Sequence, residues 1–335
     1  MNKKIALTGI KPTGNPHIGN YFGAIKPALQ LSAQYETRYF IADYHALNQT
    51  KDPNVLREQI YEIAAAWLAC GLDPEHNLIY KQSAVPQTFE LSTILLAFTP
   101  KGLMNRAHAY KAMVQSNNEL NKDPDDGVNM GLFTYPVLMS ADILLFDADV
   151  VPVGSDQQQH LEMATDIVGV INRNYNKEIL KVPQALIHKD TGVIVGLDGR
   201  KMSKSYNNTI PMFLPEKKLR KLIMKIVTNS QTIEEPKDPD TCNVFALYKL
   251  FADQQQQEDM KKRYRAGGLG WGHAKQALYE IINETITPFR EEYNRLIADK
   301  GHIDNILERG SAQARELAEQ KLILLRKEVG VSITS

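Results

Sequence analysis

The chain has 335 residues, 43% of them hydrophobic and 23% charged, and its 39 basic and 39 acidic residues leave no formal net charge. This composition is typical of an ordinary globular protein that is long enough for two domains, so any nucleic-acid partner must bind local basic patches. No apolar run reaches the length of a membrane span and no secretory signal is recognisable, so we expect a cytoplasmic protein. Cys70 and Cys242 are expected to be buried thiols, without a metal cluster or a disulfide framework.

The first predicted element is a short buried strand that leads through a turn into a helix. Residues 5–7 are apolar, residues 9–16 contain the glycines and prolines of a turn, and a helix opens at His17. Such a junction places free backbone N–H groups and the positive end of a helix dipole at one point, which attracts phosphate. His17 and Asn20 can share one side of the first helical turn. The alternative is an ordinary turn with a capping histidine.

Strand and helix patterns alternate through the next part of the chain. Residues 37–46 and 77–82 predict two further strands, and Asp52 and Pro53 predict the start of a helix that ends at Gly71. Another helix is expected to begin at Pro86. This alternation predicts an α/β fold with a Rossmann-like parallel sheet, in which ligands bind outside the carboxyl ends of the strands.

Residues 102–127 are polar and predict a mobile connection between regular elements. Arg106 or Lys111 within it could reach a phosphate. The alternative, a solvated loop with ordinary charges, is open to the same extent.

Residues 131–146 predict the most apolar helix of the chain, with Pro136 in its first turn. Asp142 lies among its apolar residues, where an unpaired carboxylate is costly. One interpretation is that Asp142 turns toward solvent or caps a neighbour. The other is that it accepts a hydrogen bond from a ligand group in an apolar pocket lined by Tyr135 and Met139.

A second strand, turn and helix are expected from residue 150 onward. The strand at 150–153 runs into Gly154, which allows close backbone approach, and Asp156 and Gln157 present polar groups at the helix start. Such groups could hold a ribose or a substrate ammonium. An ordinary turn with a capping aspartate is the alternative.

A cationic loop follows a segment at 186–198 that is expected to be rich in β structure. Its sequence is Lys201-Met202-Ser203-Lys204-Ser205. Two lysines three residues apart suit a polyphosphate whose charge grows as pyrophosphate departs. A basic surface loop is the alternative, but it does not explain the Met-Ser spacing.

Taken together, residues 5–205 resemble the catalytic domain of class I aminoacyl-tRNA synthetases. The resemblance is carried by Pro12-Thr13-Gly14, by His17-Ile18-Gly19-Asn20 with Asn20 in place of a second histidine, and by the loop at 201–205. Residues 135–144 and 151–162 are similar to the bacterial tryptophanyl enzymes, since the tyrosyl enzymes typically have Asn at the position of His160. Residues 267–275 also recur in one bacterial branch of these enzymes.

The resemblance implies the site residues. Catalytic roles would fall to His17, Asn20, Lys201 and Lys204. ATP, accompanied by Mg²⁺ without a dedicated protein site, would contact Lys11, Pro12, Thr13, Gly19, Asn20, Gly154, Ser155, Asp156, Ile194, Lys201, Met202, Ser203, Lys204 and Ser205. Tryptophan would contact Asp142, Tyr135, Met139, Gln157, Val151, Val153 and His45. Asp142 would accept the indole N–H, and Tyr135 and Gln157 would hold the α-amino group.

The sequence departs from the family pattern at two positions. Lys11 stands where many of these enzymes have Gln, and Met113 falls near the place of a phosphate-reaching Lys. A role for Lys111 is therefore an open question.

From residue 211 the pattern is helical, and we expect a catalytic domain at 1–205 and a helical domain at 206–335. The resemblance implies that the second is an anticodon-binding domain and that the protein is a homodimer whose tRNA bridges both subunits. Basic residues that could contact tRNA phosphates are Lys217, Lys218, Arg220, Lys221, Lys225 and the cluster at 261–263. Solvated faces of amphipathic helices are the alternative.

The leading hypothesis is ATP-dependent activation of L-tryptophan to tryptophanyl-adenylate and its transfer to tRNA(Trp), with release of pyrophosphate and AMP. Its rivals are tyrosine activation, adenylyl transfer to a small metabolite, and a non-catalytic relative that binds tryptophan or RNA. Asp142, His160 and the helical second half argue against the first two rivals. The intact lysine loop argues against the third, because a binding module does not stabilise departing pyrophosphate.

Overall fold

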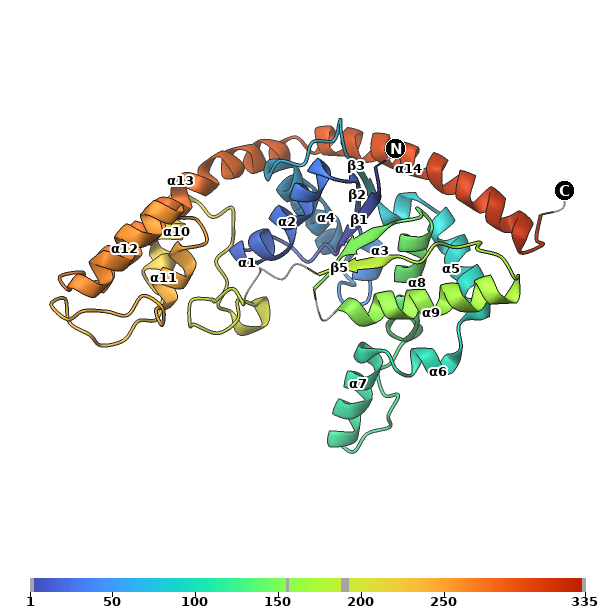
Figure 1. The fold of residues 1–335 in the computed structure, drawn as a ribbon, viewed down its shortest axis with the longest axis horizontal. Helices are drawn as coiled ribbons and strands as arrows, with labels where there is room; N and C mark the ends of the chain where they lie inside the picture. Colours follow the sequence, from blue (N-terminus) through green and yellow to red (C-terminus); the bar gives the residue numbers. More distant parts are fainter. Residues whose placement is uncertain (1–2, 155–156, 188–192, 333–335) are drawn as a thin grey trace.

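A five-stranded parallel sheet lies at the centre of the computed structural model, which describes residues 3–154, 157–187 and 193–332 (Figure 1). The strand order is β3-β2-β1-β4-β5, with bounds β1 (Ile5–Ile10), β2 (Glu36–Ile41), β3 (Leu78–Lys81), β4 (Val150–Pro152) and β5 (Gln184–Leu186). The order reverses between β1 and β4, where ligands bind in doubly wound sheets. The predicted α/β fold with a Rossmann-like parallel sheet is confirmed.

The reversal point opens toward the carboxyl ends of the strands. β1 and β2 stay in register up to Ile10 and Ile41, whereas β1 meets β4 at Ala6 and Val150, near the start of both strands. Beyond that pair β1 and β4 separate. The sheet therefore leaves room for a ligand where β1 ends.

The helix expected at His17 begins at Ile18 and changes its hydrogen-bond pattern along its length. It runs through α1 (Ile18–Asn20), the π-helical η1 (Tyr21–Ile25), α2 (Lys26–Gln30) and the 3₁₀ turn η2 (Leu31–Ala33). The Lys26 N–H reaches back five residues to the Tyr21 carbonyl, and Pro27 has no N–H with which to resume the α pattern. Wide turns of this kind often occur at functional sites.

The predicted strand at 37–46 is wrong beyond Ile41. The chain turns at Ala42 into the short helix α3 (Asp43–Ala46), where the Asp43 carboxylate accepts the N–H groups of Tyr44 and Ser83. A buried carboxylate with backbone donors thus ends β2, and a count of apolar residues does not reveal this. The next elements agree with expectation: α4 (Pro53–Ala69) is capped by Asp52, and η3 (Gln82–Ala84) and α5 (Gln87–Phe98) follow β3.

The predicted connection at 102–127 is largely helical instead. It contains α6 (Lys101–Met104) and α7 (His108–Glu119). Leu103, Met104 and Ala107 are buried in the same cluster as apolar residues of α8, and they anchor this otherwise polar stretch. The buried Asn117 side chain donates to two carbonyls of the following turn, at Pro124 and Asp126. Tertiary contacts outweigh the polar composition here.

The apolar helix expected at 131–146 is α8 (Met130–Leu144), and its proline is misplaced in the prediction. Pro136 lies inside the helix, one turn beyond the predicted place. The helix α9 (Gln158–Asn174) follows as expected. The described part of 186–198 is not rich in β structure, because β5 ends at Leu186 and the remaining contact there is a single bridge between Val195 and Lys201.

The second half is helical, as predicted, and its last helix returns to the sheet (Figure 1). Its helices are α10 (Glu216–Ile223), α11 (Asn243–Tyr248), α12 (Gln254–Ala266), α13 (Trp271–Ala298) and α14 (Lys300–Glu328). α13 packs on α4, and α14 covers the edge strand β3. A Cβ on Gly310 would lie 1.8 Å from the Ile79 carbonyl oxygen, so glycine permits this backbone contact. Covering β3 protects an exposed sheet edge.

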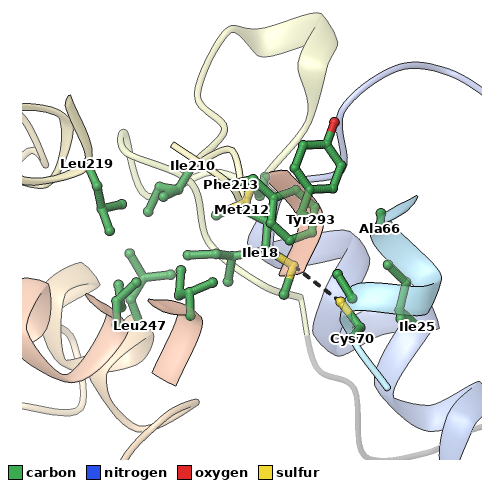
Figure 2. Close-up of a cluster of buried hydrophobic side chains, with 14 of the residues drawn as sticks. Ile18, Ile25, Ala66, Cys70, Ile210, Met212, Phe213, Leu219, Leu247 and Tyr293 are labelled. Atoms are coloured by element: carbon green, nitrogen blue, oxygen red, sulfur yellow. Dashed lines mark hydrogen bonds between the residues drawn. The ribbon is translucent and has the colours of Figure 1, made fainter. Parts of the chain in front are cut away.

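Buried apolar residues from both halves form one cluster beside the first helix (Figure 2). Ile18 and Cys70 pack there with Met212 and Leu219 from beyond residue 205. Both halves therefore share a core beside the first helix, and the division at 205/206 stays a prediction. Cys70 and Cys242 are buried free thiols, as expected. No helix in the described part of the chain is long and apolar enough to cross a membrane.

Candidate active site

A cavity of about 780 Å³ opens at the carboxyl ends of β1 and β4. Its walls are the ends of these strands, the helix after β1 and the loop around 193–206. The residues that line it are Thr8, Gly9, Ile10, His17, Gly19, Asn20, Gly23, Ala24, Pro27, Ala28, Pro152, Val153, Gly154, Ile187, Val193, Ile194, Lys201, Met202, Ser203, Lys204, Ser205 and Tyr206. This is the ligand position that the sheet order indicates.

His17 and Asn20 fix each other at the start of the first helix. The Asn20 N–H donates to His17 Nδ1 at 3.2 Å, and the His17 N–H donates to Asn20 Oδ1 at 3.0 Å. His17 is 8% exposed, and burial, followed by the charge of Lys204, lowers its pKa to about 4. His17 is therefore neutral at neutral pH. Because Nδ1 is an acceptor, its proton lies on Nε2, and the ring presents an N–H donor to the site.

The helix start is also held by a segment from beyond the lysine loop. The Ile18 N–H donates to the Ile210 carbonyl at 3.0 Å, and the Met212 N–H donates to the Pro16 carbonyl at 3.0 Å. A Cβ on Gly19 would lie 2.9 Å from His17 Nδ1 and 3.4 Å from Met202 Sδ. Glycine at this position therefore lets the helix start and the lysine loop lie against each other.

Lys204 reaches across the cavity to the turn after β1. Its Nζ donates to the Thr13 carbonyl at 2.7 Å. Burial lowers the pKa of Lys204, and the nearby carboxylate of Glu62 opposes this change. Burial also lowers the pKa of Lys11 on the same turn. The Lys204 ammonium is partly removed from water and bonds an uncharged carbonyl. A charged phosphate oxygen would therefore form a stronger hydrogen bond with it.

A second group of polar side chains is buried around Asp142. Asp142 is 2% exposed, with His45 Nε2 at 2.9 Å from Oδ2 and Gln82 Nε2 donating to both oxygens at 2.9 Å. The Gln82 carbonyl oxygen accepts the N–H groups of Tyr44 and His45 at 3.2 and 3.4 Å. Burial raises the pKa of Asp142, and His45 and Gln82 counteract it. The interpretation that Asp142 turns toward solvent is therefore wrong.

Further predicted residues surround this group. The Tyr135 hydroxyl lies 2.5 Å from His160 Nε2, and the Tyr135 ring contacts the ring of His45. Val153 lines the cavity and packs against the same apolar cluster as Met139 and Val151. Asp142, His45, Gln82 and Tyr135 themselves are not among the described residues that line the cavity. Because His45 and Gln82 follow β2 and β3, the Asp142 group lies at the same carboxyl edge of the sheet as the cavity. Gln157 stands immediately before α9.

Some predicted residues lie away from the cavity lining. Among the described residues, Lys11, Pro12 and Thr13 are not part of that lining, and Thr13 reaches it through Lys204. Ser155 and Asp156 lie outside the described residues. Arg106 lies 3.9 Å from Asp166, and Lys111 lines a separate hollow on α7, so neither faces the cavity.

Gln82 and Tyr206 belong to the site without having been predicted from the sequence. Gln82 directly follows β3, at the edge where ligand-binding side chains gather, and a polar residue at that place is the signal that identifies it. Tyr206 lines the cavity, and the Arg200 guanidinium lies 4.7 Å from its ring centroid. Nothing in the spacing around Tyr206 indicates this contact.

The chain matches the model of the tRNA synthetases class I (W and Y) over residues 2–287. It is 50% identical over 336 aligned residues to the "Tryptophan--tRNA ligase" of Bordetella pertussis, covering 99% of this chain and 74% of that protein. The Neisseria meningitidis "Tryptophan--tRNA ligase" is 47% identical, covering 99% of both.

The fold is similar to a solved structure of a related protein. The tryptophanyl-tRNA synthetase from Campylobacter jejuni, complexed with ADP and tryptophan, has a TM-score of 0.89 and 43% sequence identity. The comparison covers 97% of this chain and 99% of that one.

Proposed function

Because the chain belongs to the class I tRNA synthetases for tryptophan and tyrosine, we propose that the cavity and the Asp142 group form one tryptophan-activating site. The protein activates L-tryptophan with ATP to tryptophanyl-adenylate and transfers the tryptophanyl group to tRNA, releasing pyrophosphate and then AMP. The observation that carries the choice of tryptophan is Asp142, a buried carboxylate held by His45 and Gln82 beside the cavity.

ATP occupies the cavity between β1 and β4. Its contacts are assigned to the turn at 11–13, to Gly19 and Asn20, to 154–156, to Ile194 and to the loop at 201–205. The lining of the cavity by both motifs supports this assignment. Mg²⁺ would accompany ATP, held by the phosphates and water.

Tryptophan binds with its indole N–H donated to Asp142. A carboxylate has about four acceptor positions, and His45 and Gln82 leave room for a further donor. Tyr135 and Gln157 bind the α-amino group, while Met139, Val151 and Val153 contact the ring. A side chain that lacks the N–H leaves the buried carboxylate without that donor, which is the strongest form of rejection a binding site achieves.

The chemical step requires positioning and charge stabilisation. The tryptophan carboxylate attacks the α-phosphorus in line with the departing pyrophosphate, and no protein nucleophile takes part. Lys201 and Lys204 stabilise the negative charge that grows on pyrophosphate, and His17 donates a hydrogen bond from its Nε2–H to a phosphate oxygen. Lys204 exchanges the Thr13 carbonyl for the phosphates as it does so.

The helical half at 206–335 binds the tRNA anticodon region, and residues 1–205 form the catalytic domain. Lys217, Lys218 and Lys221 are exposed on α10 and suit phosphate contacts. We propose that two copies form a homodimer and that one tRNA contacts both. The helical composition beyond residue 211 supports only the assignment of tRNA binding to this half.

The deciding experiment is amino-acid-dependent ATP–pyrophosphate exchange without tRNA, across all twenty amino acids. Exchange with tryptophan alone is expected. Exchange with tyrosine would overturn the role of Asp142 and retain the fold. Absence of exchange in protein that binds ATP would overturn catalysis and favour a regulatory binding protein.

A further inference from the structure

Asn208 is a buried side chain directly beyond the lysine loop and the 3₁₀ turn η5 (Lys204–Tyr206). It is 2% exposed. Its Oδ1 accepts the Ser203 N–H at 2.8 Å, and its Nδ2 donates to Asp198 Oδ1 at 2.7 Å and to the Lys201 carbonyl at 3.1 Å. Both ends of one amide are therefore occupied, and they connect three separate points of the loop.

The backbone around Asn208 is closely packed. A Cβ on Gly196 would lie 2.4 Å from Asn208 Cγ, so glycine at 196 makes room for the amide. The Asn208 carbonyl accepts the Leu197 N–H at 2.9 Å, and the Met202 N–H donates to the Ile194 carbonyl at 2.8 Å. The loop is thus a closed hairpin with the Asn208 side chain at its base.

Asp198 receives donors from both sides of this base. Besides Asn208, it accepts the Arg200 N–H at 3.1 Å and Arg200 Nε at 2.7 Å. The hydrogen bond from Asn208 is the first cause that lowers the pKa of Asp198, to about 2. Asp198 is therefore ionised at neutral pH, so its Oδ1 can accept the hydrogen bond from Asn208.

Asn208 also stands between the lysine loop and the first helix. Two residues later, the Ile210 carbonyl accepts the Ile18 N–H. At the other end of the loop, Lys204 Nζ bonds the Thr13 carbonyl. The geometry of the cavity thus depends on a connection that runs from the loop lysines through Asn208 to the helix start.

On the basis of the proposed function, we infer that Asn208, with Asp198, is a positioning residue that sets the loop lysines for the departing pyrophosphate. Asn208 contacts the loop backbone and acts through Lys201 and Lys204. Its amide holds the Lys201 carbonyl and the Ser203 N–H at a fixed separation. Losing that amide leaves both lysines in the chain and misplaces them.

The test is Asn208→Asp, which keeps an acceptor for Ser203 and places a second oxygen against Asp198 and the Lys201 carbonyl. We expect kcat for tryptophan-dependent exchange to fall about 100-fold, because misplacement by about 1 Å has effects of that size. Tryptophan affinity in equilibrium dialysis without ATP should be unchanged. The matched control is Asn207→Asp, since Asn207 is exposed with φ +50°, a conformation that Asp accepts.

The double variant Asn208→Asp/Asp198→Asn separates positioning from general damage. It restores one donor and one acceptor to the contact, so we expect it to regain about tenfold in kcat over Asn208→Asp. Unchanged kcat in Asn208→Asp, equal loss in the Asn207→Asp control, or no recovery in the double variant would overturn the inference.

The test of this inference is separate from the test of the proposed function. Exchange by the unsubstituted protein tests the function, and the variants are compared only with that rate. If Asn208→Asp does not fold by circular dichroism, Asp198→Ala removes the acceptor alone. It should lower kcat about tenfold with tryptophan affinity unchanged, and an unchanged kcat would overturn the inference.

Discussion

The cavity and the Asp142 group lie at the same edge of the sheet but are built in different ways. The cavity is lined by strand ends, by the glycine-containing helix start and by a loop whose lysine bonds a carbonyl of another turn. The Asp142 group consists of the buried Asp142 of α8 and Gln82 at the end of β3, with the partly buried His45 of α3, and both partners bond Asp142 directly. Phosphate can be bound by backbone donors and movable cations, whereas rejection of a wrong side chain requires a fixed, buried acceptor.

The largest effect should come from Asp142→Ala, which breaks the buried group. Removing one partner of a buried ionic contact costs about 3–5 kcal/mol, so the loss of Asp142 as the indole acceptor should lower kcat/KM for tryptophan by about 150- to 5000-fold. The KM for ATP should change far less, because the cavity keeps its lining. Steady-state exchange measures both constants, with Asp166→Ala, exposed on α9, as the control. Equal losses for tryptophan and ATP would contradict separate regions.

Lys204→Ala should act on the cavity alone. Loss of one preorganised donor to developing charge lowers kcat by about 10²- to 10³-fold. Tryptophan affinity should stay nearly intact, because Asp142 and its partners are unaffected. Pre-steady-state formation of tryptophanyl-adenylate measures the rate, and Lys122→Ala, an exposed lysine paired with Asp126, serves as the control. Weakened tryptophan binding in Lys204→Ala would show that the two regions are coupled.

Gln82→Met tests how the carboxylate is kept ionised. Methionine has a similar length and no donor, and loss of a hydrogen bond to a charged group costs about 1.5–3 kcal/mol, which should raise KM for tryptophan about 10- to 100-fold. Gln82 helps to hold the pKa of Asp142 down, so its removal raises that pKa further. The acid limb of kcat/KM against pH should therefore move to higher pH. An acid limb at the same pH as in the unsubstituted protein would show that Gln82 does not lower the pKa of Asp142.

The pH dependence of stability should report His17 at the cavity. The pKa of His17 is lowered from 6.5 to about 4 in the folded chain, so the unfolded chain binds the proton more readily. His17 therefore contributes stability that is fully present above pH 6.5 and is lost as the pH falls toward about 4. Urea unfolding of His17→Asn should show a shallower decline across this window. An identical decline would contradict the assignment.

The smallest effect concerns the helical half. Replacing Lys217, Lys218 and Lys221 by Gln should leave exchange without tRNA unchanged and weaken tRNA binding. Each lost phosphate contact reduces the slope of log K against log salt by about 0.7 to 0.9. Filter binding at several salt concentrations measures the slope. An unchanged slope would mean that these lysines form only a solvated face.

Local chemistry explains which parts of the site the sequence predicts. Three continuous segments can be recognised from their residue types alone. They are the turn at 9–16, the helix start at His17 and the lysine loop. The Asp52 cap and the helix after it follow from the same short-range rules. The resemblance then supplied the residues around Asp142, and the structure shows that His45, Tyr135 and Asp142 lie together.

The predictions from sequence pattern that were wrong concern segments whose structure depends on partners distant in the chain. The strand predicted to Ala46 ends at Ile41 because Asp43 meets Ser83, and the polar stretch at 102–127 is helical because a few of its residues enter the core. Gln82 gains its role from Asp142, and Gly310 from the carbonyl of Ile79.

The sequence by itself determined the alternation of strands and helices, the glycine-containing turn after β1 and the cationic loop, since these depend on neighbours within a few residues. Only the tertiary structure decided which polar side chains share a buried space and how the lysine loop is held. Buried carboxylates and amides require partners that are brought together by packing, and no periodicity along the chain encodes that meeting.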